Sequence, residues 1–192
     1  FGLVSQVQDQ AAQLDALAHN DALTGVPNRR AWDLELARRM ANARHSGEDI
    51  VVGILDLDHF KRFNDQYGHQ AGDRLLKEAA AAWRAVLRPT DTLARYGGEE
   101  FVVLLREADA ETAREVVDRL RRAMPGGQSC SAGIACCKSD EAPSALLGRA
   151  DGEVAVARGA VAVDDLVEER ADRRSVPARG LGEHRGQQTP VL

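Results

Sequence analysis

Apolar and polar positions follow two different periods along the chain, and these divide it into helices and strands. Apolar residues spaced three and four apart within charged sequence are typical of amphipathic helices, whereas short runs rich in Val and Ile are typical of strands. Helices are therefore expected near 29–44, 71–87, 109–123 and 142–151. Strands are expected at 49–58, at 129–136, and on both sides of the glycine pair within 92–105.

The order of these elements indicates the fold class. Helix, strand, helix, hairpin, helix and strand follow one another, after a loop at 20–30 that is rich in turn formers. The hairpin does not fit regular winding of parallel strands, which places a helix between successive strands. The sequence predicts an α/β (α+β) protein with a central, mainly antiparallel sheet wrapped by helices.

Residues 1–19 carry a helical pattern of their own. Apolar residues recur as in a heptad repeat, with one Gln at the missing step. These positions are Leu3, Val7, Gln10, Leu14 and Leu17. The segment is either a short amphipathic helix packed on its own domain or the end of a dimeric coiled-coil stalk. Because the chain begins at Phe1, we expect it to be a fragment of a longer protein.

Beyond Gly152 the composition changes. Residues 153–192 lack Ile, Lys, Phe, Tyr, Trp, Met, Cys and Asn. Such a biased segment has few large apolar side chains with which to build a core. We expect a mostly disordered or weakly helical tail at 152–192, after an N-terminal helix at 1–19 and a main domain at 20–151.

Length, charge and cysteine content narrow the class of protein. The 192 residues suffice for one main domain with a real core. The net charge of −5 argues against a nucleic-acid binder, which usually carries a basic face. No apolar run approaches a membrane span and no signal peptide is visible, so we expect no membrane contact. The three cysteines lack a zinc or disulfide spacing, which favours a reducing cytoplasm.

Acidic residues stand at two unusual places. In RYGGEEF (95–101), Glu99 and Glu100 follow a glycine pair, which permits a tight turn and close approach of a nucleotide. Asp56 and Asp58 alternate at the end of the strand 49–58 and share one face. Asp56 lies in a very apolar run, where an unpaired carboxylate is costly. A nearby Lys or Arg would offset that cost, and so would a divalent cation.

The two acidic places form a metal site if their strands are neighbours. Glu99 can then approach Asp56, and the two carboxylates repel unless a positive charge lies between them. A few hard oxygen ligands suit Mg²⁺, which also binds phosphate oxygens. Two metals about 4 Å apart are a recurring arrangement for phosphoryl transfer. Lys61 and the backbone N–H groups of the following turn can face phosphate charge.

Two further pairs of polar residues could recognise a nucleotide. Asn64 and Asp73 bracket YGHQAGD, and an amide with a carboxylate matches the hydrogen-bonding edge of guanine. Each residue alone is also an ordinary turn former or helix cap. Arg88 and Asp91, in RPTD, likewise fit the end of a helix that Pro89 stops.

Together these motifs resemble those of a known family. LTGVPNRR, DLDHFKRFNDQYGHQAGD, RYGGEEF and CSAGIA occur in the order and spacing of a GGDEF domain, the diguanylate cyclase family. The match covers roughly residues 20–151, and Glu is a permitted third residue of the signature. The resemblance implies a fold like the nucleotidyl cyclase and polymerase palm. It also implies condensation of two GTP into cyclic di-GMP with release of pyrophosphate.

The resemblance also implies roles for individual residues. Asp56, Glu99 and the Leu57 carbonyl would bind Mg²⁺ (or Mn²⁺), two ions per active site. Glu99 would help to deprotonate the attacking 3′-hydroxyl, Glu100 would support the metal site from beside it, and Lys61 would stabilise phosphate charge. The residues that would contact the substrate base or its surroundings are Phe60, Asn64, His69 and Asp73.

A second site is implied for the product. RxxD before the glycine pair resembles the inhibitory site of the family. Arg88 would bind guanine or phosphate with its fork of donors, and Asp91 would accept from guanine N–H groups. Arg119, in DRLR of the following helix, falls where a secondary arginine of that site would lie.

The implied reaction determines the partners. Each domain would hold one GTP, so two domains must face each other across their active sites as a homodimer. The N-terminal helix would bring them together and raise their effective concentration towards roughly millimolar. We therefore expect GTP, cyclic di-GMP and a second copy of the chain as partners, and a sensor domain upstream of this segment.

The C-terminal end departs from the family. RAD at 149–151 fits, but GEVAVARGAVAV follows, without the usual aromatic residue. Arg158 stands where a phosphate-binding lysine is usual, and Ala162 stands where a phosphate-binding arginine is usual. Either a reading-frame change near residue 152 or a degenerate end would explain this. The chain is then either an active, product-inhibited cyclase or a catalytically weak domain that senses cyclic di-GMP.

Overall fold

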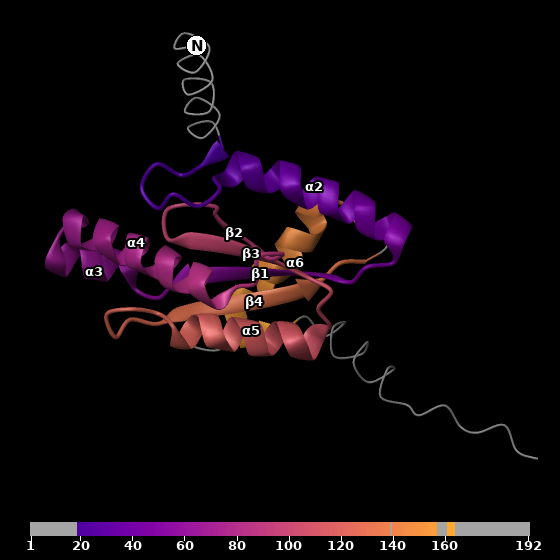
Figure 1. The fold of residues 1–192 in the computed structure, drawn as a ribbon. Helices are drawn as coiled ribbons and strands as arrows, with labels where there is room; N and C mark the ends of the chain where they lie inside the picture. The colour runs from indigo at the N-terminus through magenta and orange to yellow at the C-terminus, as the bar shows by residue number, and fades with distance from the viewer. Residues whose placement is uncertain (1–18, 139, 157–160, 164–192) are drawn as a thin grey trace, which may run out of the picture.

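The computed structural model describes residues 19–138, 140–156 and 161–163. The helices are α2 (Arg29–Ser46), α3 (Phe60–Tyr67), α4 (His69–Val86), α5 (Ala110–Arg122) and α6 (Pro143–Val156). The strands are β1 (Ile50–Leu57), β2 (Thr92–Arg95), β3 (Glu100–Arg106), β4 (Cys130–Cys136) and β5 (Val161–Val163). Figure 1 shows their arrangement.

The strands form one sheet in the order β2-β3-β1-β4-β5. All neighbouring pairs are antiparallel except β4 and β5, which are parallel. The central strand β1 is buried at every position except Asp56, which is half-buried. A strand covered on both faces needs apolar side chains on both sides, and the run IVVGIL provides them. The prediction of a central, mainly antiparallel sheet wrapped by helices is confirmed.

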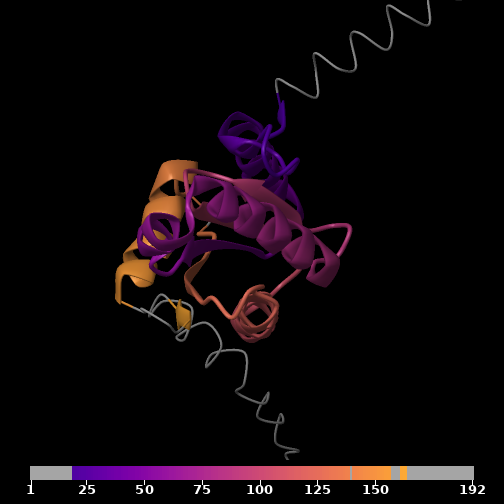
Figure 2. The same ribbon diagram turned by 90° about the vertical axis from the view of Figure 1, so that its left-hand side faces the viewer.

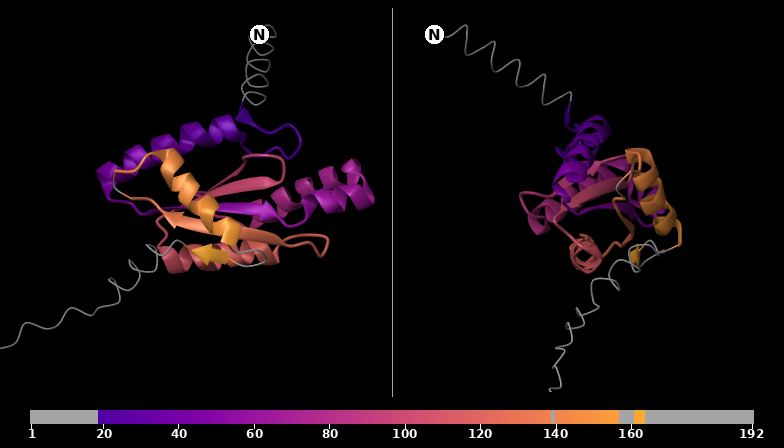
Figure 3. Two further views of the ribbon diagram at one scale, coloured as in Figure 1. Left: turned by 180° about the vertical axis from the view of Figure 1, so that it is seen from behind. Right: turned by 90° about the vertical axis from the view of Figure 1, so that its right-hand side faces the viewer.

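Helices cover both faces of the sheet, as the turned views in Figures 2 and 3 show. On one face α4 and α5 pack around a cluster that includes Trp83 and Leu120. On the other face α2 and α6 pack around a cluster that includes Trp32 and Leu146. Successive strand residues point to opposite faces, so each strand supplies side chains to both clusters.

The first helix shows how the sequence sets the boundaries of an element. The side chain of Asn28 caps α2 by accepting a hydrogen bond from the Ala31 N–H (3.0 Å). Gly47 ends the helix with φ 73°, a left-handed conformation that favours glycine. Buried side chains recur every three or four residues along one face, at Trp32, Leu36, Met40 and Ala43.

Helix α6 lies unusually close to β4 because β4 contains a glycine at the contact. A Cβ on Gly133 would collide with the Ala150 carbonyl and lie 2.7 Å from the Val154 nitrogen. The backbone of the helix can approach the strand only when no side chain stands there. Gly133 therefore determines how near the C-terminal helix comes to the sheet.

The structure differs from the expectations at three places. Most of HFKRFND (59–65), expected as a turn, belongs to the helix α3 (Phe60–Tyr67), and α4 begins at His69 rather than at 71. Helix α6 continues to Val156, beyond the expected boundary at 151. Residues 161–163, expected within an unstructured tail, pair with β4 because they add a strand to its open edge. The rest of the tail and the predicted stalk at 1–18 lie outside the described residues.

Candidate functional site

A cavity of about 510 Å³ lies where β1 ends and the chain turns into α3. Its wall combines the end of β1 with the hairpin turn, the start of β4 and one residue of α6. The lining residues are Asp56, Leu57, Asp58, His59, Phe60, Lys61, Glu99, Ser129, Ser131 and Val154. Most of the residues predicted to bind metal or phosphate therefore surround one hollow.

The pairing of β1 with β3 brings the two acidic places together. Asp56 lies opposite Glu100 in the antiparallel register. One residue further along, the Leu57 N–H donates to the Glu99 carbonyl (3.4 Å). The expected adjacency of these strands is therefore present, and the side chains of Asp56 and Glu99 line the same cavity.

Asp56 is half-buried and has several acidic neighbours. Burial raises the pKa of Asp56 to about 6, with further increases from the negative charges of Glu99, Glu100, Asp58 and Asp151. Among the described residues, no positive charge appears as a cause of this shift. The alternative of a Lys or Arg that neutralises Asp56 therefore has no support in this part of the chain.

The donor set around Asp56 fits a hard divalent cation. Two carboxylates and a backbone carbonyl at one cavity are oxygen ligands of the kind that Mg²⁺ and Mn²⁺ bind. A cation would also offset the mutual repulsion that raises the pKa of Asp56. Within the described ranges, no three His, Cys, Asp or Glu side chains gather closely enough to form a complete metal cage. Such an arrangement suits an ion whose other ligands are water and phosphate.

Asp58 is held by residues that the sequence reasoning missed. The Ser129 hydroxyl donates to one oxygen of the Asp58 carboxylate and the Ser131 hydroxyl donates to the other, each at 2.6 Å. The Asp58 N–H also donates to the Ser129 carbonyl (3.0 Å). In the sequence, the only signal for these two serines was the pattern SxS in QSCSAG. That pattern does not show that Ser129 pairs with Asp58, which lies 71 residues away.

The hairpin turn is fastened from the N-terminal side of the domain. Arg95 donates to the Gly98 carbonyl (2.7 and 3.2 Å) and to the carboxylate of Asp21 (3.0 Å). Burial acts to raise the pKa of Asp21, but hydrogen bonds from Thr24 and Arg95 outweigh it and hold that pKa below its ordinary value. The turn next to Glu99 is thus tied to the loop that precedes α2.

The glycine pair creates space rather than a left-handed turn. Neither Gly97 nor Gly98 has a positive φ. A Cβ on Gly97 would lie 2.6 Å from the carboxylate of Glu100, which folds back over the turn. A Cβ on Gly98 would meet no described atom within 4 Å. Gly98 therefore leaves open backbone beside the cavity, whereas Glu100 does not line the cavity.

The residues expected near the base come from two successive helices. Asn64 lies on α3, and His69 and Asp73 lie exposed in the first turns of α4. The Asn64 side-chain oxygen is buried against Gly72 and has no hydrogen-bond partner among the described residues. Phe60 lines the cavity, whereas Asn64, His69 and Asp73 are not among its lining residues. The α3–α4 turn thus collects the predicted base-contacting residues at one end of the domain.

The predicted product site forms an ordered turn after α4. The Arg88 N–H donates to the Asp91 carboxylate (3.1 Å), and the Asp91 N–H donates to the Arg88 carbonyl (3.0 Å). Arg88 is exposed, and so is Arg119 on α5. The Trp83 indole on α4 donates to the Leu120 carbonyl on α5 (2.8 Å), which links the helix that precedes Arg88 to the helix that carries Arg119.

Of the two residues predicted to contact phosphate, the structure describes only Lys61. Lys61 is exposed in the first turn of α3 and lines the cavity. Arg158 lies outside the described residues. Lys61 is therefore the cation that the described part of the chain offers to phosphates at this cavity.

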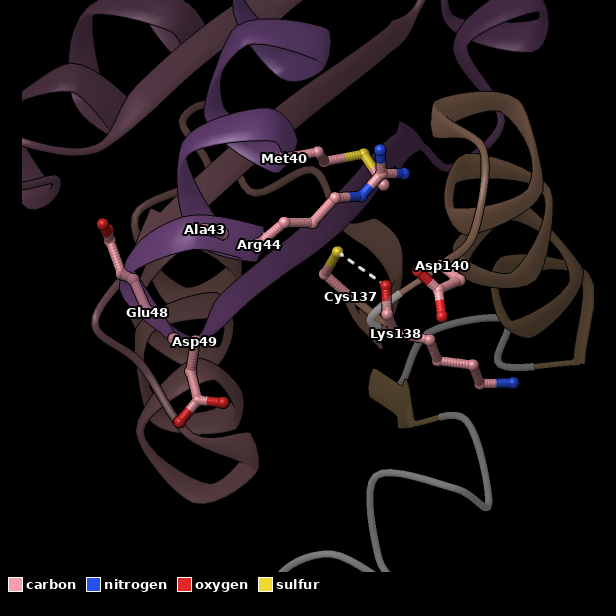
Figure 4. A pocket seen from close by; sticks show the side chains of 9 residues that line it. Met40, Ala43, Arg44, Glu48, Asp49, Cys137, Lys138 and Asp140 are labelled. Carbon is pink, nitrogen blue, oxygen red and sulfur yellow. Dashed lines mark hydrogen bonds between the residues drawn. The ribbon is translucent and has the colours of Figure 1, made fainter.

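A second, smaller cavity of about 260 Å³ lies at the other end of β1 (Figure 4). Arg44 and Lys138 stand around it with acids of opposite charge, and Met40 and Cys137 provide its sulfur atoms. Arg44 already donates to the Glu141 carbonyl (3.0 Å) and Glu48 is paired with Arg106 (2.7 Å). None of the predicted site residues lines this cavity.

Comparisons with known proteins point to one family. The family described as "Diguanylate cyclase, GGDEF domain" matches residues 18–160. The chain is 42% identical over 157 residues to diguanylate cyclase DgcP of Pseudomonas aeruginosa, covering 77% of this chain and 23% of DgcP. It is 40% identical over 122 residues to cyclic di-GMP phosphodiesterase NbdA of the same species, covering 64% of this chain and 16% of NbdA.

A solved structure is similar over most of the fold. It is the coiled coil and GGDEF domain of DgcB from Caulobacter crescentus in complex with cyclic di-GMP, at a TM-score of 0.78 and 30% identity. The match covers 83% of this chain and 93% of that one. Against DgcP and NbdA, by contrast, the chain spans less than a quarter of the full length. No helix in the described ranges is long and apolar enough to cross a membrane.

Proposed function

The chain belongs to the diguanylate cyclase GGDEF family, and we propose that it condenses two GTP into cyclic di-GMP with release of pyrophosphate. The observation that carries this proposal is the pair of carboxylates, Asp56 and Glu99, at one cavity on adjoining strand ends. The pKa of Asp56, raised by burial and further by the neighbouring acids, supports a site that binds a cation.

Asp56, Glu99 and the Leu57 carbonyl are the residues that would hold Mg²⁺ or Mn²⁺. When bound, the two ions of an active site would neutralise phosphate charge and polarise the phosphoryl group under attack. Glu99 would accept the proton of the attacking 3′-hydroxyl, since Glu99 lines the cavity. Glu100 would act on the site only through its charge, which contributes to the pKa of Asp56.

The start of α3 would orient the triphosphate. Phe60 and Lys61 of the first turn of α3 line the cavity, so Lys61 and the N–H groups of that turn would face phosphate oxygens. Asn64 and Asp73 would bind the guanine edge, with His69 and Phe60 beside it. Asn64 packs against Gly72, the residue before Asp73, so the two polar residues come from neighbouring turns of α3 and α4.

Two copies of the domain would be needed for each product molecule. One active site would present a 3′-hydroxyl to the α-phosphate held by the other, and the same step would then close the ring. The N-terminal segment would tether the two copies and raise their effective concentration. Three free cysteines fit a reducing compartment, so we place the reaction in the cytoplasm.

The second candidate function is product binding by a domain with weak catalysis. The exposed Arg88 beside an ordered Asp91 favours a product site there. The solved structure of the coiled coil and GGDEF domain of DgcB is a complex with cyclic di-GMP, and the similarity of this chain to it supports the same idea. The unusual sequence after residue 152 favours the weak-catalysis alternative.

Incubation of the chain with GTP and Mg²⁺, followed by chromatography for cyclic di-GMP, tests the proposed activity. We expect product from the wild type and at least about a hundredfold less from Glu99→Gln, because one preorganised charge at the reacting centre is lost. Glu107→Gln changes an exposed acid at the other end of β3 and is the matched control.

Two results would change the proposal. No product from the wild type, together with tight binding of cyclic di-GMP, would establish the sensor function instead. Equal rates for the wild type and Glu99→Gln would remove Glu99 from the site.

A further inference from the structure

We infer that Asp58 is a positioning residue. Hydrogen bonds from Ser129 and Ser131 hold its carboxylate, and Asp58 in turn holds the end of β1 that would bind metal. Its negative charge is not neutralised by these bonds. The inference deepens the proposed function and rests on it. Asp58 stands two residues after Asp56 and comes directly after β1 ends at Leu57, so on spacing alone it would be a third metal ligand. The structure gives its carboxylate a different task.

Both oxygens of Asp58 are already engaged. Each accepts a serine hydroxyl at 2.6 Å, the short length typical of charge-assisted bonds to a carboxylate. Ser131 is 2% exposed and is the buried polar residue of the described core. The geometry of the Asp58 carboxylate is therefore set by Ser129 and Ser131, although Asp58 lines the same cavity as Asp56 and Glu99.

The two serine hydrogen bonds to Asp58 lie at the end of β1, next to the residues that would bind the cation. The Asp58 N–H donates to the Ser129 carbonyl (3.0 Å), while on the opposite side the Leu57 N–H donates to the Glu99 carbonyl (3.4 Å). The next residue, His59, turns the chain into α3 with φ 58°, a left-handed conformation that is uncommon for a residue with a side chain. Bonds from both neighbouring strands thus hold the Leu57 carbonyl and Asp56 directly before a strained turn.

The choice of partners also preserves the charge of the site. Serine hydroxyls donate hydrogen bonds to a carboxylate without neutralising its charge. A Lys or Arg would instead offset the negative charge that attracts the cation. The charge of Asp58 remains part of the negative surroundings of Asp56. Asp58 would therefore contribute orientation through its hydrogen bonds and attraction through its charge, without coordinating the ion.

Mn²⁺ binding provides the test, because free Mn²⁺ is counted directly by electron paramagnetic resonance. The wild-type chain is titrated with Mn²⁺ in the presence of a GTP analogue whose α,β-bridging oxygen is a methylene. The double variant Ser129→Ala/Ser131→Ala should bind Mn²⁺ about tenfold more weakly, as is typical when hydrogen-bonding groups that orient a metal site from outside its ligands are lost. Its affinity for the analogue in EDTA should stay within about twofold of wild type.

Matched variants separate positioning from general damage. Ser129 is exposed, so Ser129→Ala should fold normally and weaken Mn²⁺ binding about threefold, while Ser129→Thr keeps the hydroxyl and should remain near wild type. Ser144→Ala, at an exposed position of α6, controls for serine loss. Asp58→Asn should weaken Mn²⁺ binding but not abolish it, because no ligand is removed.

Two results would overturn the inference. One is wild-type Mn²⁺ affinity in both Ser129→Ala and the double variant. The other is abolition of Mn²⁺ binding by Asp58→Asn while the serine variants bind normally, which would make Asp58 a direct ligand. Failure of the wild type itself to bind Mn²⁺ with the analogue would instead refute the proposed function, before any variant is compared.

Discussion

Asp56 combines a half-buried position with acidic neighbours, so its charge carries a cost in the metal-free protein. Its pKa of about 6 in the folded chain lies above the ordinary value of 3.8. Folding therefore favours the protonated form, and this stabilising contribution is present below about pH 4 and is lost as the pH rises through about 6. Above that range the ionised carboxylate lowers the free energy of unfolding.

Asp56→Asn should consequently stabilise the metal-free chain at pH 7. We expect a gain of about 1 kcal/mol after allowing for solvent screening, or about 2–4 °C in melting temperature. Thermal melts in EDTA from pH 4 to pH 8 would measure the difference, which should vanish near pH 4. Asp33→Asn, on the exposed side of α2, should show no such trend. A gap between wild type and Asp56→Asn that is constant with pH would contradict the pKa of Asp56.

Arg88 determines at the residue scale whether the turn after α4 binds product. Wild-type chain should bind cyclic di-GMP with micromolar affinity or better, about −8 kcal/mol. Arg88→Ala should weaken this at least tenfold, because a charged bidentate bond contributes about 1.5–3 kcal/mol. Calorimetric titration measures it, with Arg84→Ala, exposed in the last turn of α4, as control. Should Arg88→Ala bind as tightly as wild type, the RPTD turn is only a helix end.

At the scale of elements, α6 depends on one glycine of β4. Gly133→Ala would force the Ala150 carbonyl and the Val154 nitrogen away from the strand. We expect a loss of about 1–3 kcal/mol in the free energy of unfolding, as for other overpacked contacts. Because Val154 lines the cavity, the displaced helix should also weaken nucleotide binding. Urea denaturation and a nucleotide titration measure the two effects.

Gly148→Ala is the matched control and should have the opposite sign. Gly148 lies exposed within the same helix, and an added Cβ would meet no described atom within 4 Å. Alanine in a helix interior is favoured over glycine by about 0.5–1 kcal/mol. If the two variants shift stability in the same direction, the close approach of α6 to β4 does not determine the packing.

At the scale of the whole molecule, the proposed reaction needs two domains. The rate of cyclic di-GMP formation per subunit should therefore rise with protein concentration, and deletion of residues 1–18 should lower it. Measurement across a hundredfold dilution, with the mass of the species followed by light scattering, would show this dependence. A constant rate per subunit from a species shown to be monomeric would exclude the two-domain reaction.

Hydrophobic periodicity in the sequence was sufficient to predict the fold class and most elements. The apolar run of β1 and the amphipathic pattern of α4 show which residues face a core, and RYGGEEF indicated a hairpin with acids beside Asp56. The motifs indicated the family before any coordinates. Periodicity identifies the buried side of an element, however, and says nothing about which element covers it.

Only the tertiary structure identified the partners. Asp58 is gripped by Ser131, 73 residues away, and Arg95 joins the hairpin to Asp21 across 74 residues. Strand register and the path of the loops bring these residues together, and neither leaves a local pattern in the sequence. For the same reason β5 could not be predicted from the sequence. Its three residues form a strand only because β4 offers an open edge. The residue types in the sequence thus indicated which chemistry the site could support. The pairing of distant strands decided which of these residues lie together at the cavity and which are held by hydrogen bonds.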